Sequence, residues 1–431
     1  MALSLYELVV LVIQCIIVEA QDLWKERENY RASWQRRHKV FQLLPLELVA
    51  EVVENVSCEK IDQRESTVYR QRTLYSCSRV SSLLARCAQN ELLRQPYLTH
   101  GLKRFERTLR ERPELVNKIE HITFDLRDET LPSVEADAAT RIIPLLEHSR
   151  IRSIGLMEVR EVGLRQLASV PQLERLHLHL MNYAAQFNQF SLVPDQLNFG
   201  PFYNLTSLSL SAIHLPYPTG DSSPVSELYS AEMLPNLTAL ELDECCTRIA
   251  SKVNTFHFLR YLAIRCSCTR CIPELHLNET LFDPLELFEI NPHPFFLEYF
   301  RNYSHRLPKC KRLRLTAELP RFRSARTAVW IMQIISNCLR GDPETSPLRH
   351  LVAISLPDYW GKDVSEEVLL GRAELFDVAK RRGIEVDFSV ENEGTRPNRA
   401  TKAACFASDF WLTVDKLKAL ERKDLAENGA R

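Results

Sequence analysis

One short pattern recurs through the middle of the chain and limits what the chain can fold into. An apolar residue is followed by two variable residues, a second apolar residue, one variable residue and a third apolar residue. Six clear copies begin at Ile119, Ile151, Leu173, Leu205, Leu237 and Leu259, and looser copies begin at Leu285 and Cys310. A partial copy, Leu348-x-x-Leu351, and a closing segment, Ile384-x-Val386-x-Phe388, complete the series. One copy would mean little, but six in order predict a repeat architecture.

The pattern predicts one short parallel strand per copy. Because side chains alternate along a strand, the last two apolar residues of each copy lie on one side. A single copy cannot bury that side, whereas stacked copies bury a continuous core. Each buried Leu or Ile then contributes roughly 1.5–3 kcal/mol of transfer free energy. Copies begin 22 to 38 residues apart, and regular leucine-rich repeats run about 20–29 residues. We therefore predict an α/β leucine-rich-repeat solenoid, an irregular horseshoe with a parallel sheet on its concave face.

The segments that return the chain from one strand to the next should close the back of this horseshoe. Residues 136–147 and 328–339 have apolar residues at helical spacing. Pro144 should kink or shorten the first of these helices. A β-sandwich would instead show turn signals about every 8–12 residues, and the chain does not have them.

The variable positions of the predicted strands point to the concave side, where we expect a partner to bind. Along the sheet they change from imidazoles to small polar groups, then to acids and then to bases: His177, His179, Ser207, Ser209, Glu241, Asp243, Arg312 and Arg314. The two arginines lie in a basic stretch, residues 301–326, in which Glu318 is the one acid. This stretch is either a solvated basic patch or a dock for an acidic or phosphorylated segment, since Arg can bind carboxylate or phosphate through two hydrogen bonds.

Catalytic and cofactor motifs are missing from the sequence, so we predict a non-enzymatic protein without cofactors. Glycine is scarce, at 11 residues, and no glycine-rich phosphate loop occurs. A net charge of -1 gives no general attraction to nucleic acid or to an anionic membrane. Cys266, Cys268 and Cys271 could supply zinc ligands. Zinc needs four, however, and no second cysteine pair follows at a normal spacing, so unligated loop cysteines are favoured.

The start of the chain bears on localisation. Residues 8–18 are apolar apart from Gln14, but Glu7 and Glu19 flank the run and no basic residue precedes it. A signal peptide has a positive start and a small-residue cleavage site. This favours a helix packed on the body or an unstructured start, with a short membrane anchor as the alternative. The 12 irregularly spaced cysteines resemble reduced thiols, so we predict a cytoplasmic or nuclear protein. Five glycosylation sequons, at Asn55, Asn204, Asn236, Asn278 and Asn302, would matter only in a secreted chain.

Two helical segments precede the repeats. In residues 44–56, Leu44, Leu48, Val52 and Val56 recur every four residues, which predicts an amphipathic helix. Pro45 fits its first turn, where a missing N–H is tolerated. A second helical segment covers residues 73–93. By spacing alone the pair could be a plain helical hairpin that caps the repeats.

These segments resemble an F-box. The resemblance is carried by Leu44-Pro45-x-Glu47-Leu48, by Val52 and Val56, and by the run 74–81. Residues 105–119 also look like the bridge into the repeats of fungal F-box and leucine-rich-repeat proteins, so the resemblance covers about residues 41–390. In that family the F-box binds a Skp-type adaptor of a cullin ubiquitin ligase, and the repeats hold the substrate. The resemblance implies that the adaptor is contacted by Leu44, Pro45, Leu48 and Val52, with Cys77 and Val80 in support.

The sequence thus predicts the substrate-recognition subunit of a Skp-cullin-F-box ubiquitin ligase, with an unknown protein substrate. A protein-interaction scaffold without a ligase link and a membrane-anchored repeat receptor are the alternatives. The predicted division of the chain is an N-terminal helical segment (1–40), an F-box-like helical domain (41–98), a helical bridge (99–117), a leucine-rich-repeat domain (118–390) and a polar C-terminal tail (391–431). The tail has a possible short helix from Asp409 to Glu427 and a frayed end.

Overall fold

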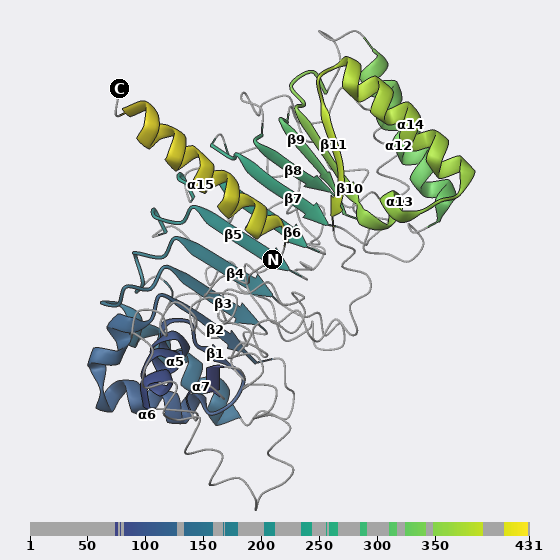
Figure 1. The fold of residues 1–431 in the computed structure, drawn as a ribbon. Helices are drawn as coiled ribbons and strands as arrows, with labels where there is room; N and C mark the ends of the chain where they lie inside the picture. Colours follow the sequence, from purple (N-terminus) through teal and green to yellow (C-terminus); the bar gives the residue numbers. More distant parts are fainter. Residues whose placement is uncertain are drawn as a thin grey trace, which may run out of the picture.

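A single parallel sheet forms the body of the protein (Figure 1). The computed structural model describes residues 74–75, 78, 82–126, 133–157, 167, 169–179, 202–211, 234–243, 256, 258–265, 285–290, 310–316, 324–341, 348–390 and 409–429. Within these ranges the sheet has 11 strands, and they lie side by side in chain order. The predicted α/β fold with a parallel sheet is confirmed, and this order is compatible with a repeat solenoid.

Each copy of the sequence pattern forms a strand. After β1 (Tyr97–Leu98), the copies give β2 (His121–Asp125), β3 (Ser153–Met157), β4 (Arg175–His179), β5 (Ser207–Ser211), β6 (Ala239–Asp243), β7 (Tyr261–Arg265), β8 (Leu287–Ile290), β9 (Arg312–Leu315), β10 (Ala353–Pro357) and β11 (Glu385–Val390). The last of these is the predicted closing strand.

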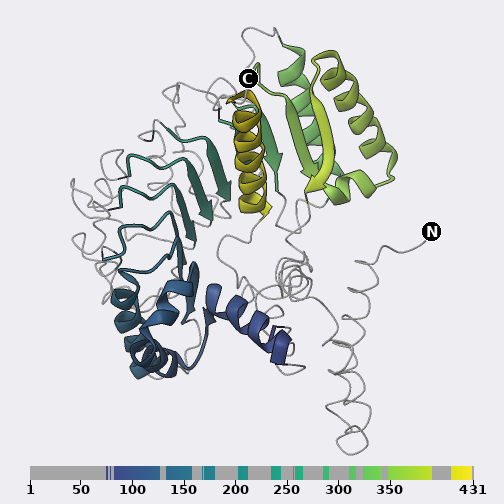
Figure 2. The ribbon, with the colours of Figure 1, turned by 60° about the vertical axis from the view of Figure 1, so that its left-hand side comes forward.

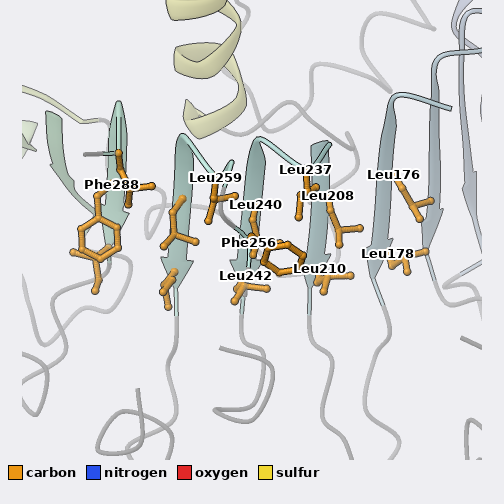
Figure 3. Close-up of a cluster of buried hydrophobic side chains, with 14 of the residues drawn as sticks. Leu176, Leu178, Leu208, Leu210, Leu237, Leu240, Leu242, Phe256, Leu259 and Phe288 are labelled. Carbon is orange, nitrogen blue, oxygen red and sulfur yellow. The ribbon is translucent and has the colours of Figure 1, made fainter. Parts of the chain in front are cut away.

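The strands are in register, so equivalent leucines stack from copy to copy. Leu176 of β4 pairs with Leu208 of β5, which pairs with Leu240 of β6 and then with Leu262 of β7. All four side chains are buried, and Figure 3 shows Leu176, Leu208 and Leu240 in a row on one side of the strands. The second and fourth residues of each strand therefore build the main core, as the alternation predicts.

Helices close the sheet at both ends. Before β2 lie α5 (Ser82–Arg94), α6 (Leu102–Glu111) and the 3₁₀ helix η2 (Pro113–Lys118). Between β2 and β3, α7 (Ser133–Ile142) gives way to the 3₁₀ helix η3 (Ile143–Leu146), which contains Pro144. The predicted shortening of this helix is thus observed, since a proline N–H is absent where an α-helical hydrogen bond would form.

The C-terminal repeats have full return helices. These are α12 (Ala325–Arg340), α13 (Asp358–Lys362) and α14 (Glu366–Arg381), and α12 packs against α14. Ser324 caps α12, because its Oγ accepts a hydrogen bond from the backbone N–H of Thr327 at 3.2 Å. Ile331 and Ile335 of α12 and Leu375 of α14 are buried in the main core, so these helices cover the leucine side of the sheet.

Amide side chains tie successive copies together at the turns before the strands. Asn204 donates from Nδ2 to the carbonyl of Pro171 at 2.7 Å, and Asn236 donates to the carbonyl of Tyr203 at 2.6 Å. Gln172 makes the equivalent contacts one copy earlier, with the carbonyls of residues 146, 147 and 149. The sequons at Asn204 and Asn236 therefore coincide with a packing contact between repeats, in which the nitrogen that a glycan would modify already donates a hydrogen bond.

One helix lies on the other side of the sheet. Helix α15 (Asp409–Gly429) lies over the strands, roughly along their direction, on the face opposite the leucine rows (Figures 1 and 2). The sequence predicted a short helix from Asp409 to Glu427 with a frayed end. A helix is present there and continues to Gly429, and its buried residues Phe410, Trp411 and Val414 pack against the sheet.

Several predictions fall outside the described residues. They concern the start of the chain, the segment 44–56 with Leu44, Pro45, Leu48 and Val52, the positions Cys77 and Val80, and the cysteines 266–271. Of the second F-box-like segment, the structure describes Leu74 as buried and Tyr75 as exposed. Across the described ranges, no helix combines the length and the apolar character needed to cross a membrane.

Candidate binding surface beneath the C-terminal helix

The first, third and fifth residues of the strands form a second sheet face, which we call the polar face. It contains every residue that the sequence predicted for the concave surface: His177 and His179 from β4, Ser207 and Ser209 from β5, Glu241 and Asp243 from β6, and Arg312 and Arg314 from β9. The structure therefore brings all eight onto one face. The strand alternation that predicted the leucine core also predicted this surface.

The polar face is not open along its whole length. Ser207, Ser209, Glu241, Asp243 and Arg314 are buried, whereas the two histidines and Arg312 are half-buried. We expected these positions to face solvent or a partner protein. The five buried residues do not face solvent in this structure, and one reason is that the chain's own helix α15 lies over the middle of this face. Their binding to a partner stays a prediction.

A hydrogen-bond chain links three neighbouring strands on this face. Nδ1 of His177 lies 2.8 Å from Oγ of Ser209, and Ser209 donates to Oε2 of Glu241 at 2.6 Å. A serine hydroxyl has one hydrogen, and here Glu241 receives it. His177 must therefore donate from Nδ1 to Ser209.

An ionic chain continues across the next strands. Arg265 pairs with Glu241 at 2.9 Å and with Glu289, and Arg314 lies 3.2 Å from Glu289 through Nε. All four side chains are almost fully buried. Each buried charge from β6 to β9 therefore has a partner of opposite sign, which offsets part of the cost of burying it.

Sequence reasoning missed Arg265 and Glu289. Both occupy variable positions of repeat strands, Arg265 as the fifth residue of β7 and Glu289 as the third of β8. The signal was available, because the same strand positions had already indicated Glu241 and Arg314. Arg314 belongs neither to a solvated patch nor to an open dock, because its partners include Glu289 and Thr413 of the same chain.

The apolar contact with α15 is small and local. Phe410, Trp411 and Val414 are buried against four residues of the polar face, and Leu417 packs at the edge of this cluster. The four residues are Ala239, Tyr261, Ala263 and Leu287. The two alanines leave space for the aromatic rings above them, which lie edge to face with centroids 5.0 Å apart.

Polar contacts orient the helix on the sheet. Nε1 of Trp411 donates to Oε2 of Glu241 at 2.5 Å, and Arg314 donates to Oγ1 of Thr413 at 2.7 Å. Further out, two arginines hold two helix carboxylates with both guanidinium nitrogens: Arg175 of β4 pairs with Asp415, and Arg260, just before β7, pairs with Glu421. Such two-bond pairs fix direction as well as position.

Burial changes the acid–base properties of this surface. Burial raises the pKa of the Tyr261 phenol, which also lies 3.2 Å from Glu421, so it remains a hydrogen-bond donor. The pKa of Lys418 is lowered, first by burial and then by the charge of Arg175. At the other end of the face, burial and the nearby Arg175 lower the pKa of His121 to about 4. At neutral pH the His121 imidazole near Arg175 is therefore uncharged.

In comparisons with known proteins, no protein-family model and no curated protein matches the sequence. Within the part of the chain that the structure describes, no group of three or more His, Cys, Asp or Glu side chains is placed to hold a metal ion. The polar face binds a helix through three kinds of contact. Glu241 accepts a hydrogen bond from an indole, Arg175 and Arg260 pair with carboxylates, and buried ion pairs line the surface below.

Proposed function

We propose that the chain is a protein receptor whose repeat sheet holds a helical protein segment on its polar face. One observation carries this proposal: a helix already occupies that face, held by an indole hydrogen bond to Glu241 and by the arginine clamps on Asp415 and Glu421. A surface that binds one amphipathic helix through anchors of this kind has the chemistry to bind another.

The architecture supports the same conclusion. One pattern copy per strand, parallel pairing in chain order and a core on one face of the sheet are the features of a leucine-rich-repeat solenoid. In such an array the residues that stack the repeats and the residues that face a partner are separate sets. Leu208 and Leu240 belong to the first set, and Ser209 and Glu241 belong to the second.

The resemblance to an F-box supports a more specific role. We propose that the receptor is the substrate-recognition subunit of a Skp-cullin-F-box ubiquitin ligase, with Leu44, Pro45, Leu48 and Val52 on the adaptor. This step depends on sequence alone, because those residues lie outside the described ranges. Its substrate would be a protein held by the repeats.

A pull-down tests the ligase role directly. The full chain should co-purify with a Skp-type adaptor, and Leu48→Asp should abolish this because it places a charge in the middle of an apolar stripe. Glu54→Gln, on the other side of the same predicted helix, is the matched control and should retain binding. Failure of the wild-type chain to bind any Skp-type adaptor would remove the ligase role and leave the receptor role intact.

One observation favours the alternative of a scaffold whose N-terminal helices only cap the sheet. Helix α5 leads directly into the first strands: Arg94 accepts a hydrogen bond from the N–H of Glu120 at 2.9 Å through its carbonyl, and its side chain pairs with Glu120 at 3.0 Å. Thr123 also donates to the carbonyl of Pro96. A scaffold would not bind a Skp-type adaptor, and Leu48→Asp would not change its binding to other proteins. The adaptor pull-down therefore separates the two functions.

A further inference from the structure

The sheet does not need α15 for its own core. The main core lies on the leucine side and contains no residue of α15, whereas the cluster under α15 holds three buried helix residues and four strand residues. Much of the floor beneath the helix consists of paired charges and hydroxyls rather than apolar side chains. Removal of the helix would therefore expose groups that water can solvate, and the leucine stack would stay closed.

The anchoring of α15 is concentrated in its first half. Phe410, Trp411 and Val414 are buried, whereas Leu420, Arg422 and Lys423 are exposed. Beyond Lys418, Glu421 contacts Arg260 and Tyr261 at the start of β7. A helix whose buried side chains lie in its first turns, and whose ion pairs to Arg175 and Arg260 are partly exposed, belongs to the part of a structure that opens locally.

Most residues of α15 that touch the sheet form one stripe; Thr413, which accepts a hydrogen bond from Arg314, lies outside it. At 100° per residue, positions 410, 411, 414, 415, 418 and 421 fall on the same side of a helix. The stripe reads as an aromatic pair, a carboxylate four residues after Trp411 and a second carboxylate ten residues after it. Each of these three features has a partner on the sheet: Glu241 for the indole, Arg175 for the first carboxylate and Arg260 for the second.

We propose that α15 is a displaceable ligand held in place by its own chain, and that the partner of this protein is a helix on another protein with the same stripe. The partner carries an aromatic anchor over Glu241 and Ala263, and carboxylates that reach Arg175 and Arg260. The acidic character of the partner follows from the two arginine clamps. This inference rests on the proposed receptor function and adds to it the class of partner and its control by self-occupancy.

A labelled peptide of residues 409–429 tests the inference in trans on the full chain. In the double variant Trp411→Ala, Asp415→Ala the resident helix is weakened, so the peptide should bind. The wild-type chain should bind it at least about ten-fold more weakly, because its own helix competes at the high effective concentration of a tethered ligand. Equal affinity for both chains, or no binding to the double variant, would overturn the proposal.

Two controls make either result interpretable. Far-UV circular dichroism and hydrogen exchange at β5 to β7 report whether the double variant keeps its sheet. A charge exchange at an exposed position adds a second test: Arg260→Glu in the double variant should weaken binding about ten-fold, and a Glu421→Arg peptide should restore it. Loss without restoration would contradict the predicted binding geometry.

Peptide variants separate the stripe from the rest of the helix. A Trp411→Ala peptide should lose binding, and a Leu420→Ala peptide should retain it. Dimerisation of the chain through exchange of α15 would overturn the proposal, since the partner would then be a second copy. The ligase role is tested separately by capture on the adaptor, so a failed peptide experiment with successful capture would reject this inference and leave the ligase role standing.

Discussion

The indole of Trp411 donates a hydrogen bond of 2.5 Å to Glu241, which lies 170 residues earlier in the chain. This bond joins the C-terminal helix to the centre of the sheet's polar face. Glu241 also accepts from Ser209 and pairs with Arg265, so the indole completes a buried polar network that spans several strands. The function proposed above depends on whether this bond is permanent or can be exchanged for one from a partner.

Loss of the Trp411 side chain should release the helix and leave the sheet folded. In Trp411→Ala, backbone amides of α15 should exchange with solvent roughly ten-fold faster or more, because the indole bond and its buried ring are both lost. Amides of β5 to β7 should keep their protection. Leu420→Ala removes an exposed apolar side chain of the same helix and should change neither. Equal loss of protection in helix and strands would show one cooperative unit.

Arg265 should be the most sensitive charged residue of the polar face. Arg265→Ala leaves Glu241 and Glu289 buried without their shared partner, which should lower the free energy of unfolding by about 3–5 kcal/mol. Arg152, whose pair with Glu174 is exposed and 3.9 Å long, is the control; Arg152→Ala should cost less than about 1 kcal/mol. Urea unfolding of both variants measures the difference, and similar midpoints would refute it.

Two glycines near the C-terminal repeats should respond in opposite ways to alanine. A Cβ at Gly361 would lie 2.7 Å from Cβ of Phe388, so Gly361→Ala should destabilise by about 1–3 kcal/mol. At Gly371, inside α14, the nearest atom is the flexible end of Met332 at 3.2 Å. Gly371→Ala should be neutral or stabilise by up to about 1 kcal/mol, since alanine favours helix. Thermal unfolding compares the two, and a reversed order would count against this packing.

The amide contact between repeats should be measurable at Asn236. Asn236→Ala removes the 2.6 Å bond to the carbonyl of Tyr203 and should lower the free energy of unfolding by about 0.5–1.5 kcal/mol. Gln333, exposed on α12, is the control, and its replacement by alanine should have no cost. An unchanged urea midpoint for Asn236→Ala would mean that the contact does not stabilise the stack.

His121 should make the fold sensitive to mild acid. Its pKa is lowered from 6.5 to about 4 by burial and by Arg175, so the unfolded chain binds this proton more readily. The contribution to stability is complete above about pH 6.5 and is lost as the pH falls towards 4. The imidazole resonance should titrate near pH 4 in NMR spectra, and His121→Asn should flatten the stability profile in this range. Titration near pH 6.5 in the folded protein would contradict the placement.

Much of the sheet could be predicted from the sequence because its determinants are local. The alternation in Leu205-x-x-Leu208-x-Leu210 selects a strand, places its leucines on one face and places Ser207 and Ser209 on the other. Repetition of the pattern then determines which strand follows which. The same logic located Glu241 and Arg314, and it would have located Arg265 and Glu289 if every variable position had been read.

The position of the C-terminal helix could not be predicted in this way. Residues 409–427 have helical character, but nothing in their sequence names the strands on which they lie. The seat for Trp411 exists only after Glu241, Ala239 and Ala263 have been brought together from β6 and β7.

The sequence alone therefore determined the strands, their order and the face to which each side chain points, because these follow from neighbours along the chain. Only the tertiary structure decided that the polar face is occupied and that its charges are paired. That outcome depends on complementarity between Trp411, Asp415 and Glu421 and a surface assembled from strands far apart in sequence. No local pattern encodes such complementarity, since the energy of the contact appears only when both surfaces are complete.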